Sequence, residues 1–126
     1  MSAASAGAAV RTVTGMAVSS DYRDFVLEQL APLGHVTSRR MFGGVGVYAN
    51  GLFFALIDDD VLYLKGDEDL RPEFEAAGSQ IFDPFGDGRT LNYWTAPAEA
   101  LDDPEVLLEW SRKSLEVAAK KASKKR

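Results

Sequence analysis

The spacing of apolar residues along the chain predicts three helices. Apolar residues recur at three- and four-residue intervals in 20–33, 70–77 and 104–119, which places them on one face of a helix. Each segment begins at residues that favour a helix start: Ser20 or Asp21, the acidic run at 67–69, and the pair Asp103-Pro104. Glycines at 34 and 78 predict where the first two helices end.

β-Branched and aromatic residues predict five strands. They are concentrated in residues 36–48, 52–57, 61–65, 80–85 and 90–95. Asn50-Gly51 is typical of a type I′ turn between the first two strands, and the three residues 86–88 predict a second hairpin loop. Glycines at 43, 44 and 46 interrupt the first strand. They lack the spacing of a phosphate-binding loop, and we interpret them as a bend within that strand.

The resulting order, α-β-β-β-α-β-β-α, predicts an α+β fold of two layers. Short hairpins connect most strands, so the sheet is expected to be antiparallel and five-stranded, with the helices on one face. Residues 52–57 are apolar nearly throughout, which indicates a central strand whose two faces are both covered. We expect a protein partner or a second copy of the chain to cover the face without helices, and we predict a homodimer.

The length of 126 residues fits one domain. We assign residues 20–119 to it, residues 1–19 to a disordered leader rich in Ala, Ser and Gly, and residues 120–126 to a basic tail. No apolar run approaches the ~20 residues that span a bilayer, and we expect a cytoplasmic protein.

Charge is divided unevenly along the chain. Residues 112–126 hold seven basic residues and one acid, whereas the other 111 residues hold seven basic residues and eighteen acids. The acidic body disfavours a nucleic-acid groove on the fold itself. The tail offers a weak nucleic-acid contact, or simply a solvated helix end whose cations face the helix dipole. Its candidate residues are Lys120, Lys121, Lys124, Lys125 and Arg126.

Familiar catalytic and metal-binding patterns are missing from the sequence. The chain has no cysteine, which excludes disulfides, thiolate metal sites and cysteine nucleophiles. Its single histidine, His35, follows a helix-ending glycine, and the adjacent acids at 58–60 form a turn without calcium-loop spacing. We therefore expect no cofactor, no metal and no enzymatic activity.

Two groups of residues are candidates for binding a partner. Arg39 and Arg40 are neighbours on a strand, so they point to opposite faces of the sheet. Each of them either lies at an interface or forms an ordinary charge pair on the strand. Tyr93 and Trp94 also alternate, so we expect one of them to be partly exposed unless both are core residues. The full set of candidates is Arg39, Arg40, Phe42, Phe53, Arg89, Tyr93 and Trp94.

These residues also form a known pattern. The run from Arg39 to Tyr48 (RRMFGGVGVY), then Phe54-Ala55, Leu62-Tyr63-Leu64-Lys65, Gly88-Arg89, Pro97, Leu101-Asp102-Asp103-Pro104 and Trp110 resembles the N-terminal domain of the TfoX/Sxy family. The resemblance implies a secretion-chaperone-like α+β fold. It also implies kinship with bacterial regulators of natural competence, which act in transcriptional control and carry a second, helical C-terminal domain. We expect this chain to be a stand-alone N-terminal domain. The family brings no agreed enzymatic activity and no established ligand-binding residues.

The leading hypothesis is a non-enzymatic bacterial regulatory module that binds proteins. One alternative is a weak nucleic-acid-binding protein that uses the basic tail. Another is a small-molecule sensor or enzyme that uses Arg39, Arg40 or Arg89 beside the glycine bend.

Overall fold

The computed structural model describes residues 19–41, 44–84 and 86–124. In this part of the chain six strands form one antiparallel sheet, in the order β1-β2-β3-β4-β6-β5. The strands are β1 (Val36–Met41), β2 (Gly44–Ala49), β3 (Leu52–Asp58), β4 (Val61–Lys65), β5 (Ile81–Phe82) and β6 (Leu91–Thr95). The predicted α+β class is confirmed, with six strands where five were expected.

The extra strand arises because the predicted bent strand at residues 36–48 is two strands. The chain reverses between Met41 and Gly44, which are paired with each other, and β1 runs antiparallel to β2. The glycines allow neighbouring strands to approach closely. A Cβ on Gly44 would lie 2.5 Å from the carbonyl oxygen of Ile57 in β3, and one on Gly46 would lie 2.6 Å from the methyl carbon of Met41.

The predicted turns at 50–51 and within 58–60 are confirmed, whereas the loop predicted at 86–88 is longer, because β5 ends at Phe82 and β6 begins at Leu91. Asn50 and Gly51 have φ angles of 52° and 85°, the left-handed pair that a type I′ turn requires. Asp59 and Asp60 adopt the same kind of conformation, with φ angles of 53° and 57°, between β3 and β4. Each of these turns has two residues, so β1 to β4 form a continuous meander.

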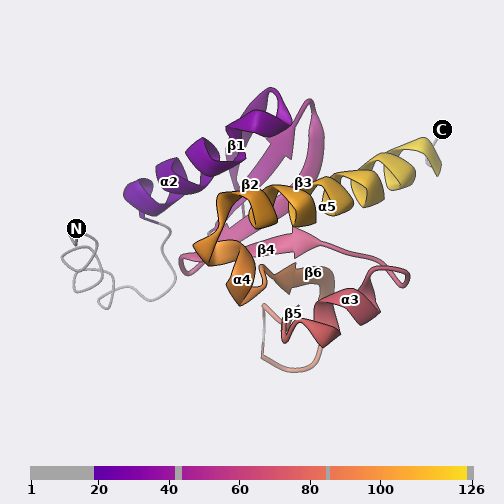
Figure 1. The fold of residues 1–126 in the computed structure, drawn as a ribbon. Helices are drawn as coiled ribbons and strands as arrows, with labels where there is room; N and C mark the ends of the chain where they lie inside the picture. Colours follow the sequence, from indigo (N-terminus) through magenta and orange to yellow (C-terminus); the bar gives the residue numbers. More distant parts are fainter. Residues whose placement is uncertain (1–18, 42–43, 85, 125–126) are drawn as a thin grey trace.

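The helices cover one side of this sheet (Figure 1). They are α2 (Ser20–Leu30), continued by the 3₁₀ turn η1 (Ala31–Leu33), then α3 (Arg71–Ala76), α4 (Ala98–Asp102) and α5 (Pro104–Lys124). Helix α5 packs on β3 and β4, and α2 and α4 pack against α5. Helix α4 was not expected from the sequence, because it has only five residues.

Side chains cap two of the helix starts, and at α5 the cap is the one that the sequence suggests. The Asp103 carboxylate accepts a hydrogen bond from the Glu105 N–H at 3.0 Å at the start of α5. Helix α2 is capped by Ser19 rather than by Ser20 or Asp21, because the Ser19 hydroxyl accepts from the Tyr22 N–H at 3.1 Å.

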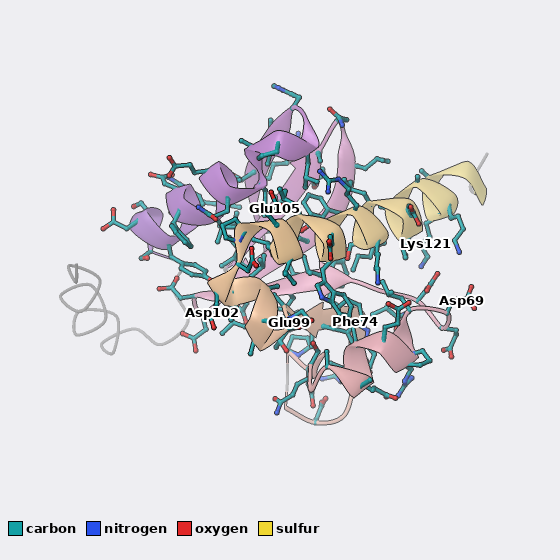
Figure 2. The ribbon with its side chains drawn as sticks, viewed as in Figure 1. Asp69, Phe74, Glu99, Asp102, Glu105 and Lys121 are labelled. Atoms are coloured by element: carbon teal, nitrogen blue, oxygen red, sulfur yellow. The ribbon has the colours of Figure 1, made fainter. Side chains whose placement is uncertain are left out.

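The main core lies between the helices and the sheet. Its centre is Phe74 of α3, which is fully buried and stacks on Trp94 of β6 and Trp110 of α5, with ring centroids 5.8 Å and 5.0 Å apart. Figure 2 shows Phe74 between α3 and α5. A bulge in β3 adds to this core. Because β2 pairs Val47 with Ala55 and Tyr48 with Phe53, Phe54 is an extra residue in β3, and both Phe54 and Ala55 are buried in this core.

Candidate functional site

The sheet has a second apolar cluster on the side away from the helices, which we call the open face. Its buried members are Leu56, Phe82 and Tyr93, with Phe53 and Tyr63 packed against them, and all five are strand residues. No helical residue belongs to this cluster in the described part of the chain. The expectation that the strand at 52–57 has two apolar faces is therefore confirmed.

Aromatic rings from β2, β3 and β6 form a row across the open face. Tyr48 of β2 stacks on Phe53 of β3 with centroids 5.1 Å apart, and Phe53 lies 5.6 Å from Tyr93 of β6. A second pair, Tyr63 and Phe82, lies with centroids 4.6 Å apart. Because the rings shield one another, much of their surface is removed from water although nothing from the helix layer covers them.

Two cations lie over this row. The Lys65 Nζ donates a hydrogen bond to the Tyr93 hydroxyl at 3.1 Å and lies 4.9 Å from the centroid of that ring and 5.8 Å from the Phe53 ring. The Arg39 guanidinium carbon lies 5.9 Å from the centroid of Tyr48. Such distances permit cation–π attraction, which holds both cations against the aromatic surface. The open face therefore combines apolar rings with positive charge.

The titration of the open-face groups does not favour acid–base chemistry near neutral pH. Burial raises the pKa of Tyr93 to about 12, with a smaller contribution from the nearby charge of Tyr48. Burial also raises the pKa of Tyr63, with further contributions from Asp58 and then Asp59. Both hydroxyls stay protonated at neutral pH and serve as hydrogen-bonding groups rather than as bases.

The structure brings three of the predicted partner-binding residues together on the open face: Arg39, Phe53 and Tyr93. Arg40 is exposed on the opposite side of β1, where it pairs across from Val45. Of the two alternatives for Tyr93 and Trp94, the structure confirms that both are core residues. Tyr93 is 8% exposed and Trp94 is 4% exposed, because Trp94 faces the helices and stacks on Phe74. Phe42 lies outside the described residues.

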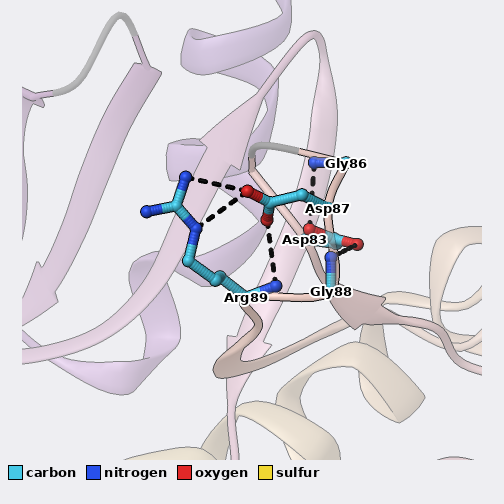
Figure 3. A network of polar contacts seen from close by, with 5 residues as sticks. All are labelled: Asp83, Gly86, Asp87, Gly88 and Arg89. Atoms are coloured by element: carbon cyan, nitrogen blue, oxygen red, sulfur yellow. Dashed lines mark hydrogen bonds and ion pairs between the residues drawn. The ribbon is translucent and has the colours of Figure 1, made fainter.

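Arg89 belongs to a separate polar loop (Figure 3). The Asp83 carboxylate accepts hydrogen bonds from the Gly86 and Gly88 N–H groups at 3.0 Å and 3.2 Å, which closes the loop. The Arg89 guanidinium forms an ion pair with Asp87 at 2.8 Å and lowers the pKa of that carboxyl. These contacts explain Arg89 as a loop-stabilising residue, and they place it apart from the cations of the open face.

The basic tail is only partly described. Lys120 lies at 3.4 Å and 3.8 Å from the carboxylates of Asp67 and Asp69, so its charge is engaged by the body of the protein. Lys121 is exposed near the end of α5 (Figure 2). The Lys124 side chain and the residues Lys125 and Arg126 lie outside the described part. Nucleic-acid binding by this tail stays a prediction.

Sequence reasoning missed several open-face residues. Tyr48, Tyr63 and Lys65 belong to it, and period-two alternation along β2 and β4 is the signal that places them on the same side as Phe53. The contact of Lys65 with Tyr93 was not visible in the sequence, because it depends on β6 pairing with β4 rather than on local spacing.

Other parts of the described structure offer less for chemistry. In the ranges that the structure describes, no group of three metal-ligating side chains comes together, and no helix is long and apolar enough to cross a bilayer. A charged hollow between the start of α3 and α5 is lined by Asp67, Asp69, Glu73, Lys113 and Lys120 among others. None of Arg39, Arg40 and Arg89 lines it, so it does not support the sensor hypothesis for those residues.

Comparison with known proteins identifies the family. The sequence profile of the TfoX N-terminal domain matches residues 28–118, which is most of the described fold. The chain belongs to the TfoX N-terminal domain family. A curated relative, the DNA transformation protein TfoX1 of Aliivibrio fischeri, is 38% identical over 50 residues, which are 40% of this chain. The match spans only 24% of that relative, so this TfoX N-terminal domain corresponds to a part of the longer protein.

Proposed function

We propose that this chain is a non-enzymatic regulatory module of the competence-regulator type, which works in the cytoplasm by binding another protein. Membership of the TfoX N-terminal domain family and the similarity to a protein named for DNA transformation support the regulatory role. The open face supports the mode of action, because an apolar sheet face without a helix layer is a surface that a partner can cover.

The observation that carries this proposal is the row Tyr48–Phe53–Tyr93 with its two cations. Aromatic rings and arginines are enriched where proteins bind one another, because they bury a large area at a low cost in conformational entropy. The arrangement fits a partner with an apolar surface and carboxylates placed to meet Arg39 and Lys65.

A complementation experiment tests the open face. Phe53→Arg is introduced into the chain, which is then expressed in cells of its source organism that lack the native gene. Transcript levels are measured to see whether the variant reverses the changes caused by loss of that gene. We expect the variant to fold and to fail in restoring them. The matched control is Leu101→Arg, which introduces the same arginine at an apolar residue that is 56% exposed on the helix side. This variant should restore the native transcript levels fully.

Two results would overturn the proposal. Full complementation by folded Phe53→Arg protein shows that the open face has no role. Light scattering that finds a dimer for the native chain and a monomer for Phe53→Arg would overturn a different protein as the occupant of this face and would support the homodimer that the sequence predicts.

A further inference from the structure

Strand β1 is an open edge of the sheet. It pairs with β2 on one side, and no other strand of the described ranges pairs with it. It is also the long edge, because the opposite edge strand, β5, consists of Ile81 and Phe82 alone. An edge of six residues is long enough to pair with an extended segment of another chain.

The pairing with β2 shows which backbone groups face outward. The Asn50 N–H donates to the His35 carbonyl at 2.8 Å, so residues 35 and 50 form a hydrogen-bonded pair of this ladder. Hydrogen-bonded and non-hydrogen-bonded pairs alternate in an antiparallel ladder. The backbone N–H and carbonyl groups of Thr37 and Arg39 therefore also form hydrogen bonds with β2. The N–H and carbonyl groups of Val36, Ser38 and Arg40 therefore point away from the sheet. They form a row of hydrogen-bond donors and acceptors that a further strand can pair with.

Two of the six side chains on this edge are basic, and neither has an acidic partner among the described residues. Arg39 and Arg40 are both exposed, and neither forms an ion pair with any described residue. Among the described arginines, Arg23, Arg71 and Arg89 are each paired with a nearby carboxylate, whereas Arg112, like Arg39 and Arg40, forms no ion pair with a described residue. The two arginines point to opposite sides of β1, one over the open face and one toward the helix side.

We propose that β1 binds an extended acidic segment of a partner protein, which adds to the sheet as a seventh strand. The backbone of the segment pairs with Val36, Ser38 and Arg40, and two consecutive carboxylates reach Arg39 and Arg40, because neighbouring residues of a strand also point to opposite faces. The inference rests on the proposed function and names the class of partner segment, since Arg39 connects this edge to Tyr48 on the open face.

A second copy of this chain fits the edge poorly. Antiparallel pairing of two β1 strands would add two more arginines and no carboxylate, so the charges of Arg39 and Arg40 would stay unbalanced. Charge complementarity therefore favours a different, acidic segment.

The test is an NMR titration of the full-length ¹⁵N-labelled chain. The probe is a capped peptide Thr-Val-Glu-Glu-Val-Thr, and the control is Thr-Val-Lys-Lys-Val-Thr. With the acidic peptide we expect amide shifts along β1 and slower hydrogen exchange at the outward amides of Val36, Ser38 and Arg40. The lysine peptide should give neither effect.

Three variants separate charge from backbone pairing. Arg40→Glu should weaken binding of the acidic peptide at least tenfold and allow the lysine peptide to bind. The control Arg112→Glu, the same charge change at an exposed position on α5, should leave both affinities unchanged. Ser38→Pro removes one outward N–H without removing a bond to β2, and it should also weaken binding while the fold is retained.

Several results would overturn the inference. These are shifts confined to strands other than β1, binding that is unaffected by Arg40→Glu, equal binding of both peptides, and displacement of the acidic peptide by single-stranded DNA. Self-association of the native chain through β1 would overturn it as well. If the peptide does not bind while Phe53→Arg still abolishes complementation, the inference fails and the proposed function stands. If the peptide binds while Phe53→Arg complements fully, the proposed function fails on its own test.

Discussion

Replacement of Phe74 tests how the helix layer is attached to the sheet. Its ring is fully buried between Trp94 of β6 and Trp110 of α5, so three elements far apart in the sequence meet at one side chain. Phe74→Ala removes both stacking contacts and leaves a cavity at the centre of the core.

The size of the effect follows from this burial. Truncation of a buried phenylalanine to alanine costs about 3–5 kcal/mol, which includes the lost contacts and the cavity. A domain of this size has a total stability of roughly 5–15 kcal/mol, so the loss is a large fraction of the whole. With the usual proportion of about 4–8 °C per kcal/mol, the Tm should fall by more than about 12 °C.

The chain supplies its own probe for this experiment. Its two tryptophans are the residues that stack on Phe74, so tryptophan fluorescence in urea reports on the site and on global unfolding together. Phe25→Ala is the control, because that ring is 52% exposed and should cost less than about 1 kcal/mol. A loss below 1 kcal/mol for Phe74→Ala, or equal losses for both variants, would refute the reasoning.

Three further substitutions test the turns and the sheet, each by thermal or urea unfolding. Gly44→Ala should destabilise by about 1–3 kcal/mol, because its Cβ would meet the Ile57 carbonyl oxygen, and an unchanged Tm would contradict this. Gly51→Ala should lower the free energy of unfolding by about 1–2 kcal/mol because the φ of residue 51 is +85°, although an added Cβ would have no atom beyond its chain neighbours within 4 Å. A neutral result would show that the turn adapts. Burial, with a contribution from Asp59, raises the pKa of Asp58 above 3.8 in the folded protein, so stability falls as the pH rises from the unfolded to the folded pKa. Asp58→Asn should therefore be more stable than the native chain at pH 7, with a gain that disappears at pH 3; a gain equal at both pH values would exclude this cause.

The strands and long helices could be predicted because local patterns determine them. Period-two alternation, the Asn50-Gly51 pair and the Asp103-Pro104 start all act over a few residues, and each appears in the structure as expected. The reversal between β1 and β2 could not be predicted in the same way. Consecutive glycines suit a bend and a turn equally well, and the outcome depends on how closely Gly44 approaches Ile57 in β3.

The candidate site was predictable only where a single strand carried the signal. Arg39 and Phe53 were expected at an interface from their own strands, and both lie on the open face. Lys65 was missed because its contact with Tyr93 joins residues 28 positions apart. Trp94 stayed a partner-binding candidate beside the core alternative, because its stacking on Phe74 requires α3 to pack beneath β6, which no local pattern shows.

The two-residue turns between β1 and β4 have a consequence for how the protein is made. Each of these pairings closes a short loop, so the meander can form as soon as its residues leave the ribosome. Helix α5, which covers β3 and β4, follows all six strands in the sequence and is therefore synthesised after them. Synthesis proceeds at about 5–20 residues per second, so for several seconds α5 does not yet cover the helix side of the meander. Val47, Ala55 and Leu64 lie on this side. Formation of α5 thus ends the exposure of this side of the sheet, while the open face stays uncovered.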